Sequence, residues 1–500
     1  TSSADKDASS ALLKYADFSH YADYFNGMED ENIVQAIPNA KASEWMEENI
    51  PLFECPQHNF EEMYYYRWWS LRKHIKETPV GYGMTEFLVQ RSYSDKYNLI
   101  ACAIGHHIYE SRWLRDPKYL DQIIHTWYRG NDGGPMKKMD KFSSWNADAV
   151  LARYMVDGDK DYLLDMKKDL ETEYQRWERT NRLKNGLYWQ GDVQDGMEES
   201  ISGGRRKKYA RPTINSYMYG NAKALSCIGI LSGDEGMAMK YGMRADTLKN
   251  LVENELWNTR HQFFETMRTD SSANVREAIG YIPWYFNLPD TTQKYEIAWK
   301  EIMDEKGFSA PYGLTTAERR HPEFRTRGVG KCEWDGAIWP FASAQTLTAM
   351  ANFMNNYPQT VLSDSVYFRQ MELYVESQYH RGRPYIGEYL DEVTGYWLKG
   401  DQERSRYYNH STFNDLIITG LIGLRPRLDN TIEVNPLIPA DKWDWFCLDN
   451  VLYHGHNLTI LWDKNGDRYH CGKGLRIFVD GKEVGQANTL TKIVCENALK

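Results

Sequence analysis

The stretch that decides the fold is residues 144–177, SWNADAVLARYMVDGDKDYLLDMKKDLETEYQRW. Two apolar-periodic segments flank the turn Asp157-Gly158-Asp159, in which Gly ends one helix and Asp caps the next. In the second segment the large apolar residues follow helical spacing and mark one buried face: Leu163, Met166, Leu170, Tyr174 and Trp177. The pattern predicts a helix, a tight turn and a second helix.

The same unit recurs along the chain, with Gly-Asp or Asp-Pro turns between the helices. Further helices are expected at 60–77, 99–113, 118–128, 215–231, 235–251, 337–354, 363–379 and 411–424. Together they make roughly six antiparallel hairpins, which in a closed ring form an (α/α)6 toroid. A solenoid of helix pairs is the alternative, but solenoids keep a stricter period and lack long loops between their units.

The pattern changes after residue 427. Short alternating segments at 431–434, 458–462 and 475–479 predict strands, and the Asn-Gly and Asp-Gly pairs at 465–466 and 480–481 are hairpin-turn signals. We therefore expect a mainly α chain in three parts: a lead-in segment (1–45), an (α/α)6 domain (46–426) and a small all-β domain that forms a β-sandwich-like cap (427–500).

Composition limits the classes of partner. Of the 500 residues 14% are aromatic, a surplus that suits stacking on flat or apolar ligand faces. The net charge is −10, and the short basic run at 205–208 is better explained as a solvated loop than as a nucleic-acid site. The seven cysteines form no Cys-x-x-Cys pair, so neither a zinc site nor a disulfide framework is predicted.

No stretch of the sequence reaches the ~18 consecutive apolar residues of a membrane span. The chain starts at Thr1 rather than Met, which fits a removed leader and equally a piece of a longer protein. A periplasmic or secreted location is expected, and no oligomeric state is predicted.

Two loops far apart in the sequence carry clustered acids among Trp and Tyr residues. The first, 188–200, contains Asp192, Asp195, Glu198 and Glu199, and the second contains Glu388. Acids in loops are most often solvated or cap helices. Two acids brought together beside aromatic faces are also what glycosidic bond cleavage needs, because one protonates the leaving oxygen and the other serves as base or nucleophile.

At these loops the sequence resembles the inverting (α/α)6 glycoside hydrolases related to glycoside hydrolase family 63 and to the mannosylglycerate-hydrolase-like domain, over roughly residues 60–425. That group has a motif close to Glu-Ser-Gly-Met-Asp-Asn-Ser, whose Asp is the general acid. The sequence Asp-Gly-Met-Glu-Glu-Ser at 195–200 places Glu198 at the acid position. The group's Glu-Tyr-Tyr-Asp-Pro-x-Thr-Gly motif contains the general base and is similar to 388–395, which places Glu388 at the base position.

Other landmarks of the group follow in order, at 281–283, 313–316 and 333–340. Glu198 is one methylene longer than the group's Asp, and Asp335 replaces an Arg, so Asp195 or Asp192 remains an alternative proton donor. The resemblance implies no metal and no cofactor. It also implies a substrate-binding set in the same segments: Trp189, Asp192, Glu199, Trp334, Asp335, Trp339 and Tyr389.

We therefore expect an exo-acting glycoside hydrolase that cleaves an oligo- or polysaccharide with inversion, with Glu198 or Asp195 as acid and Glu388 as base. A polysaccharide lyase that uses residues 407–410 and a non-catalytic carbohydrate-binding protein are the alternatives. His106 and Glu110 lie four residues apart on one helix face and could ligate a metal. A third ligand is not evident near them in the sequence, which favours a hydrogen-bonded pair.

Overall fold

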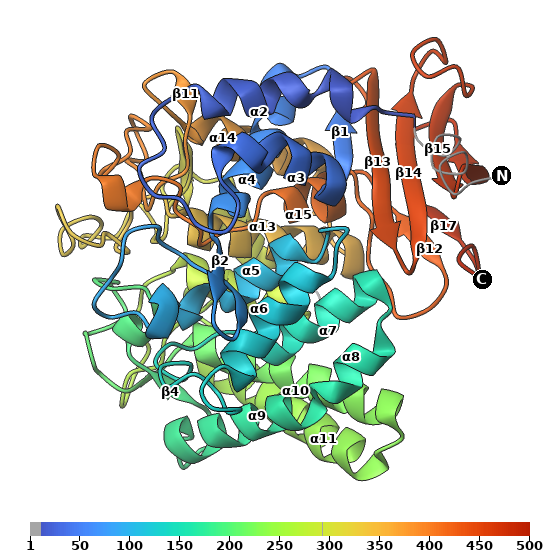
Figure 1. Cartoon of the computed structure of the whole chain (residues 1–500). Coiled ribbons are helices and arrows are strands. Elements are labelled where there is room, and N and C mark those ends of the chain that lie inside the picture. Colours follow the sequence, from blue (N-terminus) through green and yellow to red (C-terminus); the bar gives the residue numbers. More distant parts are fainter. Residues whose placement is uncertain (1–11, 293) are drawn as a thin grey trace.

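The structure is a computed structural model of the chain and describes residues 12–292 and 294–500. It is mainly helical, with an antiparallel sheet near the C-terminus (Figure 1). Of the lead-in segment expected at 1–45, residues 1–11 lie outside the described residues. The remainder contains α2 (Ser19–Asn26) and the start of α3 (Ala42–Asn49), and both helices pack against α4 (His58–Lys73).

Six helices make contacts that close on themselves. α5 packs against α7, α7 against α10, α10 against α12, α12 against α13, α13 against α15, and α15 returns to α5. Their bounds are Ile104–Ser111, Asn146–Asp157, Pro212–Ser232, Ile282–Tyr285, Pro340–Asn356 and Asn414–Leu416, and a π-helical turn (Ile417–Leu421) continues α15. Other helices surround this circuit: α6 (Lys118–Arg129), α8 (Lys160–Asp165), α9 (Lys167–Asn181), α11 (Glu235–Leu251) and α14 (Asp364–Ser377).

Gly-Asp turns separate the helices as the sequence predicted. α7 ends at Gly158, whose φ of 69° is unfavourable for a residue with a side chain, and the side chain of Asp159 accepts a hydrogen bond from the backbone N–H of Tyr162 at 3.1 Å. α10 ends in the same way at Gly233 (φ 74°), and Asp234 caps α11. Each turn therefore reverses the chain within a few residues.

The helix expected at 60–77 is too long. It ends at Lys73, and Ile75–Thr78 forms β2, which pairs with β3 (Gly81–Met84) in a hairpin. The helical periodicity does continue past residue 73, but β-branched Ile75 and Thr78 followed by Pro and Gly favour a strand and a turn. This hairpin carries the chain to the loop that begins at Thr85.

The C-terminal sheet includes one strand from the N-terminal part of the chain. Its order is β1-β13-β14-β15-β16, and β1 (Leu52–Glu54) pairs antiparallel with β13 (Trp445–Tyr453) at one edge (Figure 1). The other strands are β14 (His456–Asp463), β15 (Gly474–Val479) and β16 (Lys482–Ala487), while β12 (Ile432–Val434) pairs with β17 (Ile493–Cys495). The Asp-Gly pair at 480–481 forms the two-residue turn between β15 and β16, with φ values of 49° and 82°. None of the helices in the described ranges has the length and apolar character needed to cross a membrane.

Candidate active site

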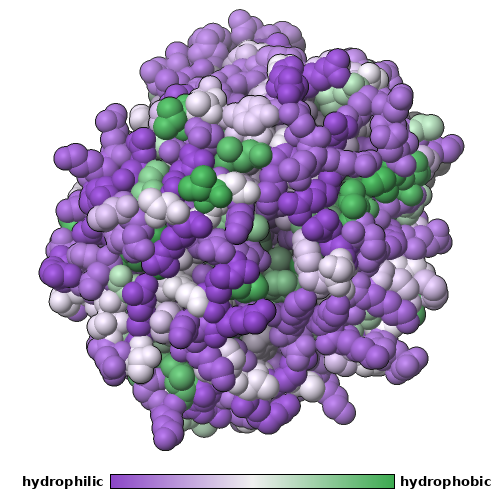
Figure 2. Space-filling model, turned by 90° about the vertical axis from the view of Figure 1, so that its left-hand side faces the viewer, coloured by the Kyte–Doolittle hydropathy of each residue, from purple (hydrophilic) through white to green (hydrophobic). Residues whose placement is uncertain are grey.

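One cavity brings the two acidic loops together. It has a volume of about 440 Å³ and is lined by both Glu198 and Glu388. It lies where loops lead into the helix circuit, because Phe142 precedes α7, Trp339 precedes α13 and Tyr408 precedes α15. Figure 2 views the loop-bearing side of the molecule and shows a hollow near its centre, with apolar residues in its depth and hydrophilic residues around it.

Backbone geometry turns Glu198 into this cavity. A 3-10 turn at Asp192–Asp195 ends at Gly196 with φ 73°, and Glu199 also adopts a positive φ of 62°. Burial, with a smaller contribution from the charge of Glu388, raises the pKa of Glu198 to about 7. A carboxyl group with this pKa still holds its proton in a large fraction of molecules at neutral pH.

Glu388 differs from Glu198 because a cation stands beside it. The Nζ of Lys399 lies 3.3 Å from its Oε1, and the Sγ of Cys332 lies 3.8 Å from the same oxygen. Burial first, and then the charges of Glu198 and Glu388, raise the pKa of Cys332 to about 12, so the thiol keeps its proton. The cavity is thus lined by a carboxyl group that can hold its proton, Glu198, and by a carboxylate paired with a cation, Glu388.

An aromatic stack supports the cavity wall. The rings of Trp339 and Tyr389 lie 4.6 Å apart and nearly parallel, and Trp334 stacks on the other side of Trp339 at 4.5 Å. Only Trp339 of the three lines the cavity. Tyr389 and Trp334 therefore hold the ring of Trp339 in place and do not line the cavity themselves.

Asp195 lies behind the cavity wall. It forms a buried ion pair with Arg211, whose Nε lies 2.7 Å from Oδ2, and accepts hydrogen bonds from the hydroxyls of Thr213 and Ser143. Neither Asp195 nor Asp192 lines the cavity, and Asp192 accepts a hydrogen bond from the hydroxyl of Ser200 at 3.1 Å. Both oxygens of the Asp195 carboxylate therefore accept hydrogen bonds that hold the loop in place.

The other residues predicted to bind substrate fall into two groups. Glu199 lines the cavity and forms an ion pair with Arg205. Asp335 is fully buried and accepts backbone N–H groups of residues 327 and 328, so it orders its own loop. Trp189 lies outside the cavity, with Lys208 over its ring.

Two family models match the chain. Residues 96–411 match the model of the mannosylglycerate hydrolase MGH1-like glycoside hydrolase domain, and residues 424–485 match that of the glycosyl hydrolase family 65 C-terminal domain. The chain belongs to the MGH1-like glycoside hydrolase family. The predicted resemblance and enzyme class are thereby confirmed.

Solved structures related to this glycoside hydrolase domain differ in how much of them it covers. One named "Sialidase" is 95% identical with a TM-score of 0.99; all of this chain matches, but only 46% of that chain. The mannosylglycerate hydrolase of glycoside hydrolase family 63 from Thermus thermophilus, in complex with glucose, is 12% identical with a TM-score of 0.52 over 71% of this chain and 99% of that one. A family 78 rhamnosidase of Bacillus sp. GL1 is 12% identical with a TM-score of 0.57 over 86% of this chain and 41% of that one. The last two share the fold only.

Sequence reasoning missed one carboxyl group of the cavity, Glu86, which joins Glu198, Glu199 and Glu388 in its lining. Glu86 follows β3 and is only 4% exposed, with the thiol of Cys102 at 3.5 Å from its Oε1. Burial, with smaller contributions from the charges of Glu388 and Glu198, raises the pKa of Glu86 to about 8. Glu86 has no motif around it, so spacing alone gave no signal for its role.

The competing constellations have structural roles or lie in the same cavity. Glu110 accepts hydrogen bonds from the backbone N–H groups at the start of α15 (residues 413–415). Its carboxylate therefore caps a helix, which is a structural role. Tyr408 and His410 line the cavity, whereas the side chain of Asn409 donates to the backbone oxygen of Thr85. Burial raises the pKa of Tyr408 well above its usual value, so the phenol stays protonated.

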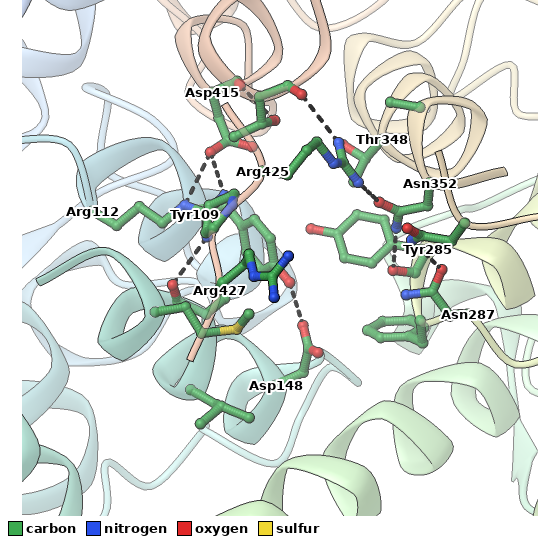
Figure 3. A pocket seen from close by; sticks show the side chains of 18 of the residues that line it. Tyr109, Arg112, Asp148, Tyr285, Asn287, Thr348, Asn352, Asp415, Arg425 and Arg427 are labelled. Carbon is green, nitrogen blue, oxygen red and sulfur yellow. Dashed lines mark hydrogen bonds and ion pairs between the residues drawn. The ribbon is translucent and has the colours of Figure 1, made fainter. Parts of the chain in front are cut away.

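A second cavity, of about 450 Å³, lies among the helix circuit and the segment that leads to the C-terminal sheet (Figure 3). Its charged and polar groups bind one another. Arg112 forms an ion pair with Asp415 at 2.8 Å, and the Nη2 of Arg425 donates to the side-chain oxygen of Asn352 at 2.6 Å (Figure 3). These contacts tie the α15 segment to α5 and α13, so we assign them a structural role.

The pKa of Glu86 predicts a pH-dependent change in stability. Because its pKa in the folded state is raised above 4.5, its contribution is fully present below pH 4.5 and declines as pH rises through about 8. Glu86→Gln removes this pH-dependent loss of stability, and its amide oxygen can still accept a hydrogen bond from the thiol of Cys102. The unfolding free energies of the variant and the wild type are measured by denaturant titration at pH 5 and at pH 9. The difference between them should shift by roughly 2–4 kcal/mol in favour of the variant as the pH rises from 5 to 9.

Glu77→Gln is the matched control, because Glu77 is exposed on the same hairpin. Its difference from the wild type should stay within about 0.5 kcal/mol at both pH values. Identical pH dependence in Glu86→Gln and the wild type would mean that Glu86 is charged in the folded protein.

Proposed function

We propose that the chain is an exo-acting glycoside hydrolase domain that cleaves a glycosidic bond of an oligo- or polysaccharide with inversion. Glu198 is the general acid and Glu388 the general base. The observation that carries the proposal is that these two residues, from loops about 190 positions apart in the sequence, line one cavity in a glycoside hydrolase domain. A volume of about 440 Å³ accommodates roughly one or two sugar units, which favours attack at a chain end.

The chemistry follows from the two environments. Glu198 holds its proton near neutral pH because of burial, and it donates that proton to the leaving oxygen as the bond breaks. Glu388, held beside Lys399, accepts a proton from the water that attacks the anomeric carbon from the opposite face. The product keeps that water oxygen in the inverted configuration, and both carboxyl groups return to their starting states by exchange with solvent.

We propose the (α/α)6 toroid as the architecture that presents this site. Two observations support it: the closed circuit of helix contacts, and the likeness in fold to the Thermus family 63 enzyme. The division into a helical catalytic domain at 46–426 and a C-terminal all-β domain at 427–500 is part of the same proposal. In this division β1 belongs to the first domain by sequence and pairs with β13 of the second.

The alternatives fit the cavity less well. A lyase needs a base to abstract a proton from the sugar ring, but the pKa of Tyr408 is raised by burial and the pKa of His410 is lowered well below 6.5, also mainly by burial. A non-catalytic binding protein would not need two acids in one cavity. An unsaturated product that absorbs ultraviolet light would identify a lyase, and binding without turnover would identify a binding protein.

Glu388→Gln tests the assignment of the base. The amide keeps the shape of the side chain but cannot accept the proton of water, so kcat on the natural glycan should fall by roughly 10²–10⁴-fold. Circular dichroism and thermal unfolding should match the wild type. Turnover close to normal in this variant would show that another group activates the water.

The stereochemistry of the product tests the single-displacement mechanism. Proton NMR recorded early in hydrolysis should show the anomer opposite to that of the substrate, because water attacks the anomeric carbon directly. Retention of configuration would instead require a nucleophilic carboxylate about 5 Å from the acid, and would place the enzyme in the other mechanistic class.

Activated substrates distinguish Glu198 from Asp195 as the proton donor. An aryl leaving group needs little protonation, so Glu198→Ala should keep much of its rate on an aryl glycoside while losing activity on the natural bond. The wild-type rate should fall as pH rises through about 7, where Glu198 loses its proton, and Glu198→Ala should lack this alkaline limb.

Asp195→Ala should behave differently, because it leaves Arg211 buried without its partner. Breaking such a pair costs roughly 3–5 kcal/mol of folding stability, and activity should fall on both kinds of substrate. Selective rescue of Asp195→Ala by the aryl glycoside, with equal losses in Glu198→Ala, would assign the proton to Asp195.

A further inference from the structure

The cavity is basic although the chain is acidic. The net charge of the whole sequence is −10, yet six basic side chains line the cavity that holds Glu198 and Glu388. They come from five segments of the chain, one of which supplies two of them: Arg91, Lys141, Arg205, Lys331, and Lys399 with Arg404. A local charge opposite in sign to that of the whole protein points to the ligand rather than to solubility.

Two of the six are paired with carboxylates of the cavity itself, Arg205 with Glu199 and Lys399 with Glu388. For the other four, the described part of the chain offers no carboxylate within ion-pair distance. The pKa values of Glu86 and Glu198, raised by burial to about 8 and about 7, further reduce the negative charge available near neutral pH. The cavity therefore has an excess of positive charge when it is empty of substrate.

Two of the unpaired cations, Arg91 and Lys141, are held in place by the same residue, Tyr93. Arg91 donates from Nε to the hydroxyl of Tyr93 at 3.3 Å and lies over the rings of Phe87 and Tyr93. Lys141 donates from Nζ to the backbone oxygen of Tyr93 at 3.0 Å. Both side chains are half-buried, whereas solvated surface cations usually extend into water.

A third unpaired cation of the cavity lining, Arg404, lies near the proposed catalytic groups. Arg404 donates from Nε to the side-chain oxygen of Gln402 at 3.1 Å, and its charge acts to lower the pKa of Cys332. Cys332 is the residue whose Sγ lies 3.8 Å from Glu388. Lys331, which precedes Cys332, is exposed at the same side of the cavity.

We propose that the substrate is an acidic glycan, and that a carboxylate or sulfate group on the sugar in the cavity or on its neighbour binds these unpaired cations. The hydroxyl groups of a neutral sugar would replace the water around Arg91 and Lys141 with hydrogen bonds to uncharged acceptors, which leave the positive charge of the cavity uncompensated. An anionic group would form charge-assisted hydrogen bonds with them, and the guanidinium of Arg91 can bind either anion through two parallel bonds. This inference rests on the proposed function of the same cavity.

Binding can be measured without turnover in Glu388→Gln. The probes are oligosaccharides that contain uronic acids and sulfated oligosaccharides, each beside its carboxyl-reduced or desulfated counterpart. Calorimetry should detect an acidic member that binds at least about 10-fold more tightly than its neutral counterpart, with an advantage that shrinks as salt is raised. The reduced and the desulfated arms distinguish a carboxylate from a sulfate.

Paired substitutions locate the contact. Arg91→Gln/Lys141→Gln should lower kcat/KM on the preferred acidic glycan by roughly 10–100-fold, while its neutral counterpart changes less than about threefold. The control is Arg179→Gln/Lys184→Gln, which removes one exposed Arg and one exposed Lys outside the cavity and should leave both rates unchanged. Thermal unfolding of each variant confirms that it is folded.

The outcomes separate this inference from the proposed function. Cleavage of neutral and acidic counterparts with equal kcat/KM, or equal losses on both in the Arg91→Gln/Lys141→Gln variant, would overturn the inference and leave the hydrolase assignment intact. Failure of every acidic probe to bind would also overturn it. Binding of an acidic glycan that the wild type does not cleave would support the cationic site and count against the proposed hydrolysis.

Discussion

The buried ion pair between Asp195 and Arg211 holds the site together. The carboxylate joins three segments, because Arg211 and Thr213 stand at the start of α10 and Ser143 precedes α7. With the side chain of Asp195 fixed at the end of a 3-10 turn, the positive φ of Gly196 directs the chain so that Glu198 lines the cavity. A desolvated charge pair of this kind requires nearly perfect geometry, and it therefore specifies the loop conformation as much as it stabilises it.

The two carboxyl groups proposed as acid and base, Glu198 and Glu388, have different surroundings. Burial dominates at Glu198 and keeps it protonatable near pH 7, whereas Glu388 has the ammonium group of Lys399 at 3.3 Å. The charge of Glu388 also helps to raise the pKa of Glu198. The mechanism that we propose needs one protonated acid and one ionised base in a shared space, and these different surroundings support the two assignments.

Much of the fold could be predicted from the sequence, because its signals are local. Helical periodicity and Gly-Asp turns located most of the helix pairs, and Gly158 and Gly233 end α7 and α10 as expected. The pairing of β1 with β13 could not be predicted, since a three-residue strand has no signal of its own and its partner lies almost 400 residues later. The helix expected to reach residue 77 is shorter than predicted, because Ile75–Thr78 pairs with β3 as a strand instead.

The site was only partly predictable. Motif similarity indicated Glu198 and Glu388, which share the cavity, but it also gave weight to Asp335, whose carboxylate binds backbone N–H groups of its own loop. Glu86 had no motif, and only the folded chain brings it from the loop after β3 into the same cavity as Glu198 and Glu388.

The cations and acids of the cavity constrain one another. A cation placed against Glu198 lowers its pKa, as Arg205 does to a small extent, and enough of them would remove the proton that catalysis needs. Three of the four unpaired cations are instead held by other partners: Arg91 and Lys141 by Tyr93, and Arg404 by Gln402. Burial can then remain the largest influence on Glu198 while positive charge stays available in the same cavity. An anionic substrate that neutralises these cations would raise the pKa of Glu198 further, so that binding itself would favour the protonated acid.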